Sequence, residues 1–403
     1  MMTDTPLPLE GIRVLDLANV LAAPVTATFL GDFGAEVIKV EEPGKGDFTR
    51  SGLGGDTEAR RSLQWLQEGR NKKSVTIDLR TEEGRCLVRA MIPHFDVVVT
   101  NYRPPTMEKW GLGPKDLQAL NPRAILVFIT GYGLTGPYSD RGAFDRIASA
   151  FSGLTYVSGD PDRAPVRSGY SVIDYMSAYL AVFATVTALY HRDIRGGSGQ
   201  IIDLGLYEAA FRASEDALIT YGVTGGVRDR VGNRNLAIAP ASDFDTADGR
   251  RISLHAGTDS LFRKLAEVMD RPELGRDPRF AFRTERLANQ DELYAIITEW
   301  VSTQDAKHAV KLLNDAGVPA SLIMNVADIA DDPHYLDRET IVTLDDEQYG
   351  AVPMAAPLPR MSETPGQIRA LGPRLGQHTE EVLSGLLGLP AHEIARLRAQ
   401  SVI

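Results

Sequence analysis

Hydrophobic and polar positions along the first half of the chain follow two alternating periods. Short apolar runs of the kind that form buried strands alternate with segments whose apolar residues recur every three or four positions, as in a helix. The strand-like runs lie at 12–17, 36–41, 74–78, 96–100 and 124–129, and the helix-like segments at 22–33, 82–92, 144–153 and 174–192. This alternation predicts an α/β domain, with a large Rossmann-like parallel sheet and right-handed crossovers.

The pattern changes near 222–235. From residue 252 a strand-like ISLHA is followed by helix-like segments, which predicts a smaller α+β domain. The polar stretch 44–69 is predicted to be a long loop, and the proline-rich chain beyond residue 320 to be irregular until a helix at 379–387. We expect the large α/β domain to start with 1–222, the smaller domain to occupy 223–335, and 336–403 to return to the large domain.

Composition and charge narrow the class of protein. The 403-residue chain has a formal net charge of -11, and a field of that sign repels phosphate, which disfavours a general nucleic-acid binder. Cys86 is the single cysteine, so no intramolecular disulfide forms, as in most cytosolic proteins. The N-terminus has no apolar signal segment, and the longest apolar run, 178–190, is too short to span a bilayer. We therefore expect a cytoplasmic protein that binds neither nucleic acid nor membrane.

Several common ligand motifs are missing. The turn at 16–24, between the first strand and its helix, lacks the glycines that bring backbone close to a dinucleotide pyrophosphate. The segment 44–47 (GKGD) lacks the spacing and the hydroxyl residue of a P-loop, and no G-x-S-x-G nucleophile elbow occurs. The seven histidines are scattered, with no pair at helix-face ligand spacing, so we expect no metal site.

Asp174 opens a helix-like segment and lies among the apolar residues Val172, Ile173 and Met176. Aspartate is strongly preferred as a helix N-cap, where it accepts backbone N–H bonds, and capping is the interpretation that the residues alone favour. A carboxylate in an apolar, partly dry setting is also a competent covalent nucleophile. The two interpretations are compatible, because the positive end of the helix dipole keeps a carboxylate ionised.

Basic residues gather in two clusters despite the acidic total. Residues 70–73, continuing to Arg80, and residues 103–109 both flank strand ends, where open parallel sheets bind ligands. A solvated charged face explains any single lysine or arginine, whereas two clusters at neighbouring strand ends favour a phosphate-binding site. The glycines of 131–137 allow either the close approach of a ligand or a tight turn.

Further segments stand out when the chain is read in order. They are PLEGIRVLDLANVLAAPVTATFLGDFGAEVIKVEEPGKGDFTR, NKKSVTIDLRTEEG, NYRPPTMEKWGLG, GYGLTGPYSDRGAFDRIASAFSGL, the segment from Asp174 through GGSGQIIDLGLYEA, and AGVPASLIMNVADIADDPHY. Jointly they resemble the class III coenzyme A transferases of the CaiB/BaiF type, the family of formyl-CoA transferase and carnitine-CoA transferase. The resemblance covers nearly the whole chain and implies an acyl-CoA:carboxylate CoA-transferase that forms an interlocked homodimer.

The resemblance also implies the site. The nucleophilic aspartate of the family precedes a helix that leads to a G-x-G-Q segment, and Asp174 holds that position ahead of Arg192 and residues 197–200. Coenzyme A is implied as a cosubstrate, with no permanently bound cofactor. The positions implied to line it are Leu21, Ala22, Ile77, Asp78, Leu79, Arg80, Asn101, Tyr102, Arg103, Lys109, Gly142, Ala143, Phe144 and Asp145. Glu42 departs from the family pattern, which often has a basic residue near the adenine at this position.

The family chemistry implies a covalent cycle. Asp174 attacks the donor thioester to give a mixed anhydride, the released CoA thiolate converts this to an aspartyl-CoA thioester, and an acceptor carboxylate then takes the CoA. The alternatives are an acyl-CoA racemase or isomerase of the same fold, or a non-catalytic CoA-binding protein. Related racemases carry a histidine immediately before the aspartate corresponding to Asp145, and this chain has Phe144 there, which favours the transferase.

The acyl donor and the acceptor acid are not encoded in any motif. Arg251, His255 and Tyr170 are candidates for contacting the acyl group, although a surface or core role is the favoured interpretation for each.

Overall fold

The computed structural model describes residues 6–52 and 61–403, which form two compact units. The larger unit runs from the N-terminal region to Leu154 and also contains Arg167–Leu218 and Glu339–Ile403. The smaller unit comprises Thr155–Val166 and Ile219–Arg338. The chain therefore leaves the larger unit twice, and its C-terminal segment belongs to that unit.

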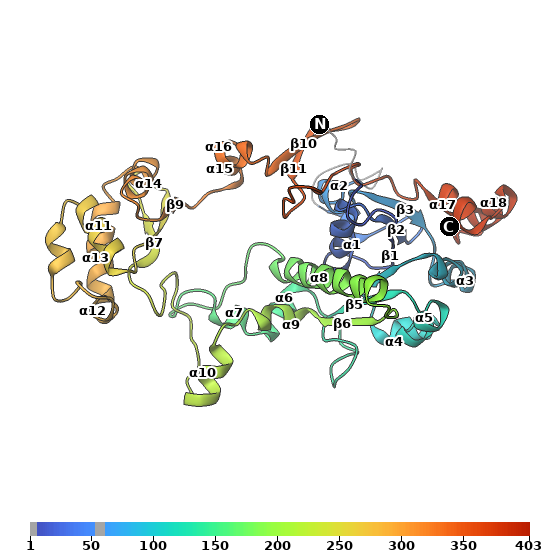
Figure 1. Ribbon diagram of the computed structural model, residues 1–403, viewed down its shortest axis with the longest axis horizontal. Coiled ribbons are helices and arrows are strands. Elements are labelled where there is room, and N and C mark those ends of the chain that lie inside the picture. The colour runs from blue at the N-terminus through green and yellow to red at the C-terminus, as the bar shows by residue number, and fades with distance from the viewer. Residues whose placement is uncertain (1–5, 53–60) are drawn as a thin grey trace. The chain divides into compact units, whose positions relative to one another are not determined.

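The larger unit is built on a six-stranded parallel sheet (Figure 1). The strand order is β3-β2-β1-β4-β5-β6, which is the doubly wound Rossmann order, and every neighbouring pair is parallel. The strands are β1 (Arg13–Asp16), β2 (Glu36–Glu41), β3 (Lys72–Thr76), β4 (Val97–Thr100), β5 (Ile125–Thr130) and β6 (Ile201–Gly205). The predicted α/β class with a parallel sheet is confirmed.

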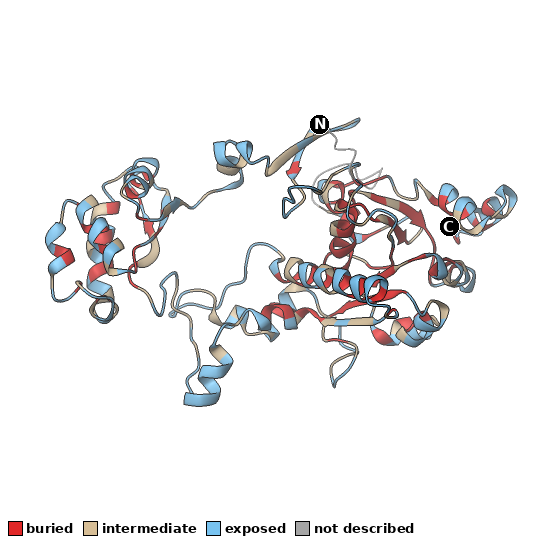
Figure 2. Ribbon diagram, viewed as in Figure 1, coloured by how far each residue is buried: buried red, intermediate tan, exposed pale blue. Residues whose placement is uncertain are grey.

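Side chains of the sheet feed two separate cores, because successive residues of a strand point to opposite faces. Val97 and Val99 belong to one core and Val98 to the other. Figure 2 shows the strands of this sheet as largely buried. Helices on the Val97 face are α1 (Ala22–Asp32), α6 (Asp145–Phe151), α8 (Val172–Ile194) and α9 (Leu206–Arg212). Helices on the Val98 face are α3 (Glu82–Met91), α4 (Pro104–Lys109), α5 (Pro114–Leu120), α17 (Thr379–Leu387) and α18 (Ala391–Ala399).

The smaller unit has its own core and a three-stranded antiparallel sheet. Arg286 of this unit has no exposed surface, and it donates to the carbonyl oxygens of Ala239 (2.8 Å) and Gly257 (2.8 Å). The strands are β7 (Ala241–Asp245), β8 (Arg251–His255) and β9 (Ala320–Leu322). The helices are α11 (Asp259–Val268), η3 (Pro272–Arg276), α12 (Arg283–Ala288), α13 (Gln290–Val301), α14 (Ala306–Asp315), α15 (Val326–Ala330) and α16 (Pro333–Asp337).

Short elements complete the chain, and some of them depart from the sequence-based expectation. The predicted loop 44–69 contains two short helices, while its residues 53–60 lie outside the described part of the chain. The region expected to be irregular after residue 320 contains an antiparallel hairpin, so that prediction is wrong; its second strand includes Pro353, which weakens a strand signal. These elements are η1 (Phe48–Ser51), α2 (Leu63–Glu68), η2 (Ile92–His94), α7 (Leu154–Val157), α10 (Ala217–Thr224), β10 (Ile341–Asp346) and β11 (Gly350–Ala355).

Helix α8 is long and apolar enough to cross a membrane by length and composition, the one such helix among the described residues. Its inner face packs on α1 and β5, and it buries the charged residues Asp174 and Arg192. A core helix of a soluble protein passes the same test, so this is weak evidence for a membrane span.

Candidate active site

The strand order of the large sheet reverses between β1 and β4, and ligands of open α/β sheets bind at the carboxyl ends of strands at such a point. The segments that follow these two strands are joined by a pair of hydrogen bonds. The Asn101 side-chain amide donates to the Asn19 carbonyl oxygen (2.6 Å), and the Asn19 N–H donates to the Asn101 side-chain oxygen (2.9 Å). The candidate CoA residues Leu21, Ala22 and Asn101 therefore come from segments that meet at the switch point.

The candidate CoA residues after β3 divide into core and surface groups. The side chains of Ile77 and Leu79 belong to the hydrophobic core, which leaves their backbone alone to face a ligand. Arg80 is exposed, but it pairs with the carboxylates of Asp78 (2.8 Å) and Glu42 (2.9 Å). Glu42, the departure from the family pattern, thus pairs with two basic side chains, Arg80 and Lys45 (2.8 Å).

The two basic clusters differ in whether their side chains are buried and paired or exposed. Arg70 is buried against Asp32 (2.7 Å), and Lys72 is buried against Asp16 (2.9 Å). These charges are already paired inside the protein, so the prediction that residues 70–73 help bind phosphate is wrong for both side chains. Arg103, in the second cluster, is exposed and donates to the Asp140 carbonyl oxygen (3.1 Å).

The rest of the second cluster and the segment before α6 contribute further candidates. Tyr102 packs edge-on against Trp110, with ring centroids 5.0 Å apart, and Lys109 is exposed at the end of α4. Gly142 and Phe144 are exposed and Ala143 is half-buried. A Cβ atom at Gly131 would lie 2.5 Å from that of Ala143, so glycine is required for this close approach.

Asp174 is the third residue of α8 and not its N-cap, which corrects the capping interpretation. Ser171 occupies the N-cap position without a side-chain cap bond. The capping acceptor is Asp145, whose Oδ2 accepts the N–H of Ile173 at 2.9 Å. Asp145 therefore fixes the first turn of the helix that carries Asp174, a role that the CoA-lining assignment of Asp145 did not include.

The surroundings of Asp174 disfavour its charged form. Its side chain is 9% exposed, and among the described residues no hydrogen bond reaches its carboxylate. Burial, followed by the negative charge of Asp145, raises the pKa of Asp174 to about 7. Burial and the charge of Asp145 thus act against the helix dipole, which we expected to keep this group ionised. A carboxylate whose pKa is raised to about 7 by an apolar setting has the properties expected of an active-site residue.

Asp174 also lies on the side of α8 that faces the start of α1. Leu21 and Val25 pack against Ala178, one helical turn beyond Asp174. Ser177 is on the same face with no exposed surface, and its Oγ has no hydrogen-bond partner among the described residues. A buried hydroxyl donor without a partner is uncommon. The nucleophile candidate, an unused donor and the switch-point segment are thus neighbouring features of one unit.

The candidate acyl-contacting residues are less informative. Arg251, on β8, pairs with Asp245 at 2.7 Å, and His255 ends the same strand. Tyr170 is 80% exposed, in the segment that precedes α8. Among the described residues, no group of three or more histidine, cysteine or acidic side chains is arranged to hold a metal ion.

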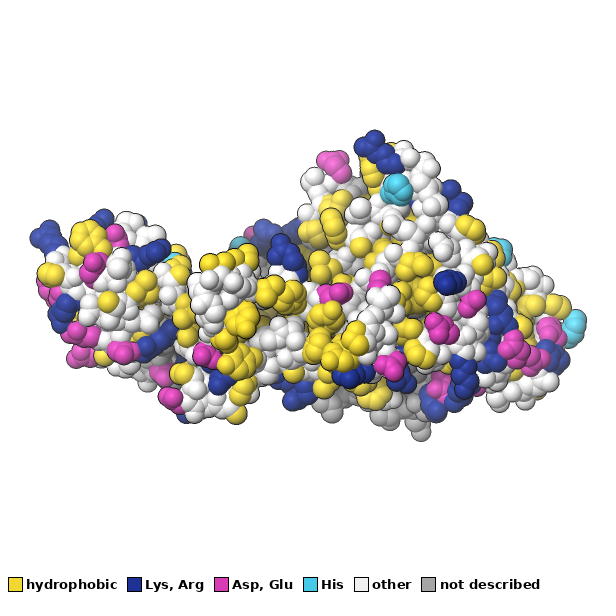
Figure 3. Space-filling view, turned by 90° about the horizontal axis from the view of Figure 1, so that it is seen from below, with side chains coloured by type: hydrophobic (Ala, Val, Ile, Leu, Met, Phe, Trp, Pro, Cys, Tyr) yellow, Lys and Arg dark blue, Asp and Glu magenta, His cyan; other side chains and the backbone are white. Residues whose placement is uncertain are grey.

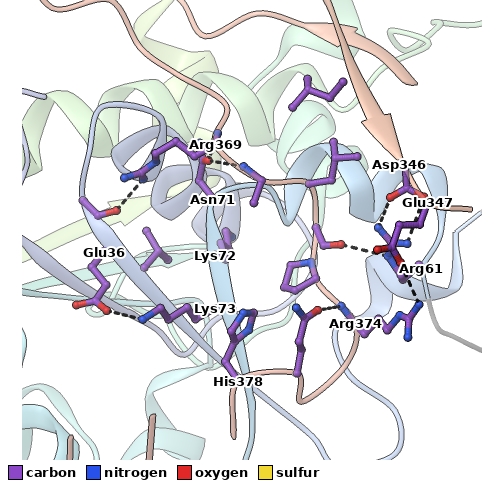
Figure 4. Close-up of a pocket in the computed structure, with 18 of the residues that line it drawn as sticks. Glu36, Arg61, Asn71, Lys72, Lys73, Asp346, Glu347, Arg369, Arg374 and His378 are labelled. Atoms are coloured by element: carbon purple, nitrogen blue, oxygen red, sulfur yellow. Dashed lines mark hydrogen bonds and ion pairs between the residues drawn. The ribbon is translucent and has the colours of Figure 1, made fainter. Parts of the chain in front are cut away.

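The cavity drawn in Figure 4, of about 980 Å³, is formed at the amino ends of β2 and β3. Two of its basic side chains pair with carboxylates: Arg61 with Asp346 (2.6 Å) and Lys73 with Glu36 (3.0 Å). None of the candidate CoA residues lines it. A site at the carboxyl ends of the strands is therefore separate from this cavity.

Comparison with known proteins decides the family. The model of CoA-transferase family III matches residues 9–379. The chain belongs to CoA-transferase family III. It is accordingly an enzyme that acts on CoA thioesters.

Named relatives of this family III CoA-transferase cover nearly the whole chain. Succinyl-CoA–D-citramalate CoA-transferase of Chloroflexus aurantiacus is 42% identical, over 99% of this chain and 98% of that protein. Succinate–glutarate CoA-transferase of Agrobacterium fabrum is 34% identical, over 96% of this chain and 98% of that protein. The crystal structure of a CaiB/BaiF family protein from Brucella suis matches with a TM-score of 0.84 and 34% identity, over 95% of this chain and all of that one.

Sequence reasoning missed two features of the family III CoA-transferase site. The first is the capping bond from Ile173 to Asp145, which joins residues 28 positions apart and has no local signal. The second is a buried lysine, Lys39, in the middle of β2. A lysine flanked by the apolar residues of EVIKVE was a visible signal, because lysine is almost never fully buried without a partner.

Proposed function

We propose that this enzyme moves CoA from succinyl-CoA to a dicarboxylic acceptor acid through covalent intermediates on Asp174. The observation that carries the proposal is the buried carboxylate of Asp174, with its pKa raised to about 7, beside the switch-point segment that holds Leu21. The relatives named above use succinyl-CoA or succinate with another dicarboxylic acid, citramalate or glutarate. Dicarboxylic substrates are therefore the first class to test.

Each step of the proposed cycle exchanges one bond at a carbonyl carbon. The Asp174 carboxylate oxygen attacks the thioester carbon and the C–S bond breaks. CoA departs as the thiolate, and Asp174 is now joined to the succinyl group as a mixed anhydride. The thiolate sulfur then attacks the aspartyl carbonyl carbon, and the bond from this carbon to the bridging oxygen breaks. Succinate is released, and the enzyme now carries an aspartyl-CoA thioester. The acceptor carboxylate repeats these two steps in reverse order, which regenerates Asp174 and yields the new acyl-CoA.

The surroundings of Asp174 suit this chemistry. Anhydrides and thioesters hydrolyse, and a side chain that is only 9% exposed is well placed to exclude water. Each tetrahedral intermediate carries an oxyanion that needs hydrogen-bond donors, and Ser177 Oγ is an unused donor on the same helix face. Coenzyme A serves as cosubstrate, and the cycle requires no permanent cofactor. The candidate CoA contacts at the switch point remain part of the proposal.

A homodimer is also part of the proposal. The outer face of α8 exposes large apolar side chains at helical spacing, and Figure 3 shows hydrophobic side chains over much of one face of the molecule. These α8 residues are Tyr179, Leu180, Phe183, Val186, Tyr190 and Ile194. Contiguous exposed apolar surface of this kind marks interaction sites, and a second copy of the chain is the proposed occupant. A cytoplasmic location with no membrane partner is a further part of the proposal.

The function is tested with purified enzyme, succinyl-CoA and a panel of acids: malate, citramalate, glutarate, oxalate and formate. We expect new acyl-CoA with the dicarboxylic acceptors, at rates at least about tenfold above formate, measured by chromatography. Tenfold discrimination corresponds to about 1.4 kcal/mol, which one charged contact to the second carboxylate supplies.

Two rival functions predict other outcomes in the same assay. A racemase or isomerase would exchange the α-proton of an acyl-CoA with deuterated water without moving CoA between acids. A non-catalytic CoA-binding protein would bind succinyl-CoA and form no product. Either outcome would replace the transferase proposal.

The pH dependence of the first step tests the electrostatics around Asp174. Attack requires the ionised carboxylate, so the rate of adduct formation with succinyl-CoA should rise with pH through about 7. In Asp145→Asn the side-chain oxygen still accepts the Ile173 N–H, but the negative charge is gone. The rise should therefore move to lower pH, by about one unit, which is typical for removal of one nearby charge. Single-turnover rates from pH 5 to 9 measure it.

A control separates charge from capping. Asp145→Ala removes both the charge and the capping acceptor, so it should also reduce the plateau rate at high pH. An Asp145→Asn profile that coincides with the wild-type profile would show that Asp145 does not perturb Asp174.

A further inference from the structure

Val20, at the sheet's switch point, has a backbone conformation that its side chain disfavours. Its φ is 69°, in the left-handed region, where β-branched residues are outliers. Other non-glycine residues with positive φ among those described, such as Asn71 and Asp270, are not β-branched. Such conformations cost on the order of 1–3 kcal/mol and persist only where surrounding structure imposes them. Something therefore holds Val20 in place.

The buried carboxylate of Asp47 contacts the Val20 backbone. The Val20 N–H lies 3.2 Å from each oxygen of Asp47, and it also donates to the side-chain oxygen of its neighbour Asn19 at 3.0 Å. Asp47 in turn accepts from Lys39 Nζ at 2.9 Å, and the side chains of this pair are 0–1% exposed. Lys39 Nζ also donates to the carbonyl oxygen of Ala18, at 2.9 Å. One ammonium group thus fixes both the residue two places before Val20 and the carboxylate that binds Val20.

A second lysine contacts the C-terminal part of the segment 18–24. Lys72 Nζ donates to the carbonyl oxygen of Pro24 (2.7 Å) and pairs with Asp16 (2.9 Å). Asp16 also lies 3.4 Å from Lys39 Nζ. Asp16, Lys39, Asp47 and Lys72 form a charge-balanced buried ionic cluster. Side chains of this cluster accept or donate hydrogen bonds at the backbone of Ala18, Val20 and Pro24.

Stability alone is a poor explanation for this buried ionic cluster. Replacing buried ion pairs by apolar side chains is often neutral or stabilising, and their best-attested use is to specify one conformation. The conformation specified here is that of residues 18–24, which include the candidate CoA residues Leu21 and Ala22. The Asn19–Asn101 hydrogen bonds hold the same segment to the end of β4.

We propose that Val20 is a positioning residue: the buried ionic cluster, acting through Asp47, holds its backbone in the left-handed conformation and thereby sets where the start of α1 meets the bound acyl-CoA. The inference rests on the proposed function, because it assigns Leu21 and Ala22 to the acyl-CoA site. It makes a specific claim about Asp47. If Asp47 serves to hold a conformation that valine resists, a residue that adopts this conformation freely makes Asp47 less necessary.

A double-mutant cycle in the full-length enzyme tests this claim, with kcat and KM for succinyl-CoA as readouts. Asp47→Asn keeps an acceptor for the Thr49 N–H but removes the charge that pairs with Lys39. We expect it to raise KM for succinyl-CoA about tenfold, with a smaller change in kcat. Glycine adopts positive φ without strain, so Val20→Gly in the Asp47→Asn background should recover most of that loss in KM.

Asp270→Gly is the matched control. It also replaces a left-handed non-glycine residue (φ 57°) by glycine, but in the smaller unit and outside the candidate site. It should leave KM unchanged alone and rescue nothing with Asp47→Asn. If Asp47→Asn does not fold, Asp47→Glu, which keeps the charge but displaces it, replaces it in the cycle.

The outcomes separate this inference from the proposed function. Effects of the Asp47 and Val20 substitutions that simply multiply would overturn the positioning role while transfer by the wild-type enzyme stands. Equal rescue by Asp270→Gly would also overturn it, because the rescue would then reflect general stability. A wild-type enzyme that transfers no CoA from succinyl-CoA would instead refute the proposed function.

Discussion

Replacing Asp174 by asparagine is expected to slow CoA transfer by roughly 10⁴-fold or more, a loss of the size seen when an enzyme loses its covalent nucleophile. Asparagine has nearly the same volume as aspartate, and its amide does not attack a thioester. The change also removes the repulsion between the carboxylates of Asp174 and Asp145, so the fold should tolerate it. Steady-state transfer from succinyl-CoA measures the loss, and calorimetric titration with CoA should give an affinity close to that of the wild type.

Asp193→Asn is the control for Asp174→Asn. Asp193 lies on the same helix, near its other end, and is exposed beside Arg192 and Arg123. Its replacement should leave transfer within about twofold of the wild type, as for most surface substitutions. Transfer by Asp174→Asn or Asp174→Ala at a rate comparable to Asp193→Asn would refute the nucleophile assignment.

The second large effect concerns folding. Arg50→Met should lower the free energy of unfolding of the large unit by about 3–5 kcal/mol, the usual cost of breaking a buried ion pair on one side. The Arg50 and Glu41 side chains have no exposed surface, and the guanidinium donates to both Glu41 oxygens at 2.6 and 2.7 Å. Arg50 also donates to the Pro373 carbonyl oxygen (2.9 Å) and lies over the Trp65 ring (3.7 Å). Methionine leaves the Glu41 charge buried without this partner.

Denaturant unfolding monitored by tryptophan fluorescence measures this change. The matched control is Arg396→Met, which breaks the exposed pairs with Glu83 and Glu393 and should shift the midpoint little. The double variant Arg50→Met/Glu41→Met should lose less stability than Arg50→Met alone, since no charge remains unpaired. A midpoint for Arg50→Met that equals that of Arg396→Met would refute the structural role of Arg50.

Much of the secondary structure can be predicted from short stretches of consecutive residues. The strand 36–41 and the helix 379–387 match β2 and α17 in both bounds, because an apolar run or an amphipathic period is a property of consecutive residues. The hairpin of β10 and β11 was missed, because its two strands contain a single buried residue and one of them contains a proline. Pairing of such strands depends on partners elsewhere in the fold, which no local pattern records.

The candidate site was predictable to a smaller degree. The family resemblance singled out Asp174, whereas the residues alone made it the N-cap of a helix whose N-cap is Ser171, three residues earlier. Whether a basic cluster is free to bind phosphate depends on partners distant in sequence: Arg70 meets Asp32, and Lys72 meets Asp16, 56 positions away. The pKa of Asp174 likewise depends on burial and on Asp145, both of which are tertiary features.

The most direct test of the central claim is to trap the intermediate on Asp174. The enzyme is mixed with succinyl-CoA in the absence of an acceptor acid, quenched with hydroxylamine, digested, and analysed by mass spectrometry. The proposed cycle predicts a hydroxamate on Asp174, formed from the anhydride or the aspartyl-CoA thioester, and no such product from Asp174→Asn. An unmodified Asp174 peptide, from an enzyme preparation that does transfer CoA once an acceptor acid is supplied, would contradict the covalent mechanism.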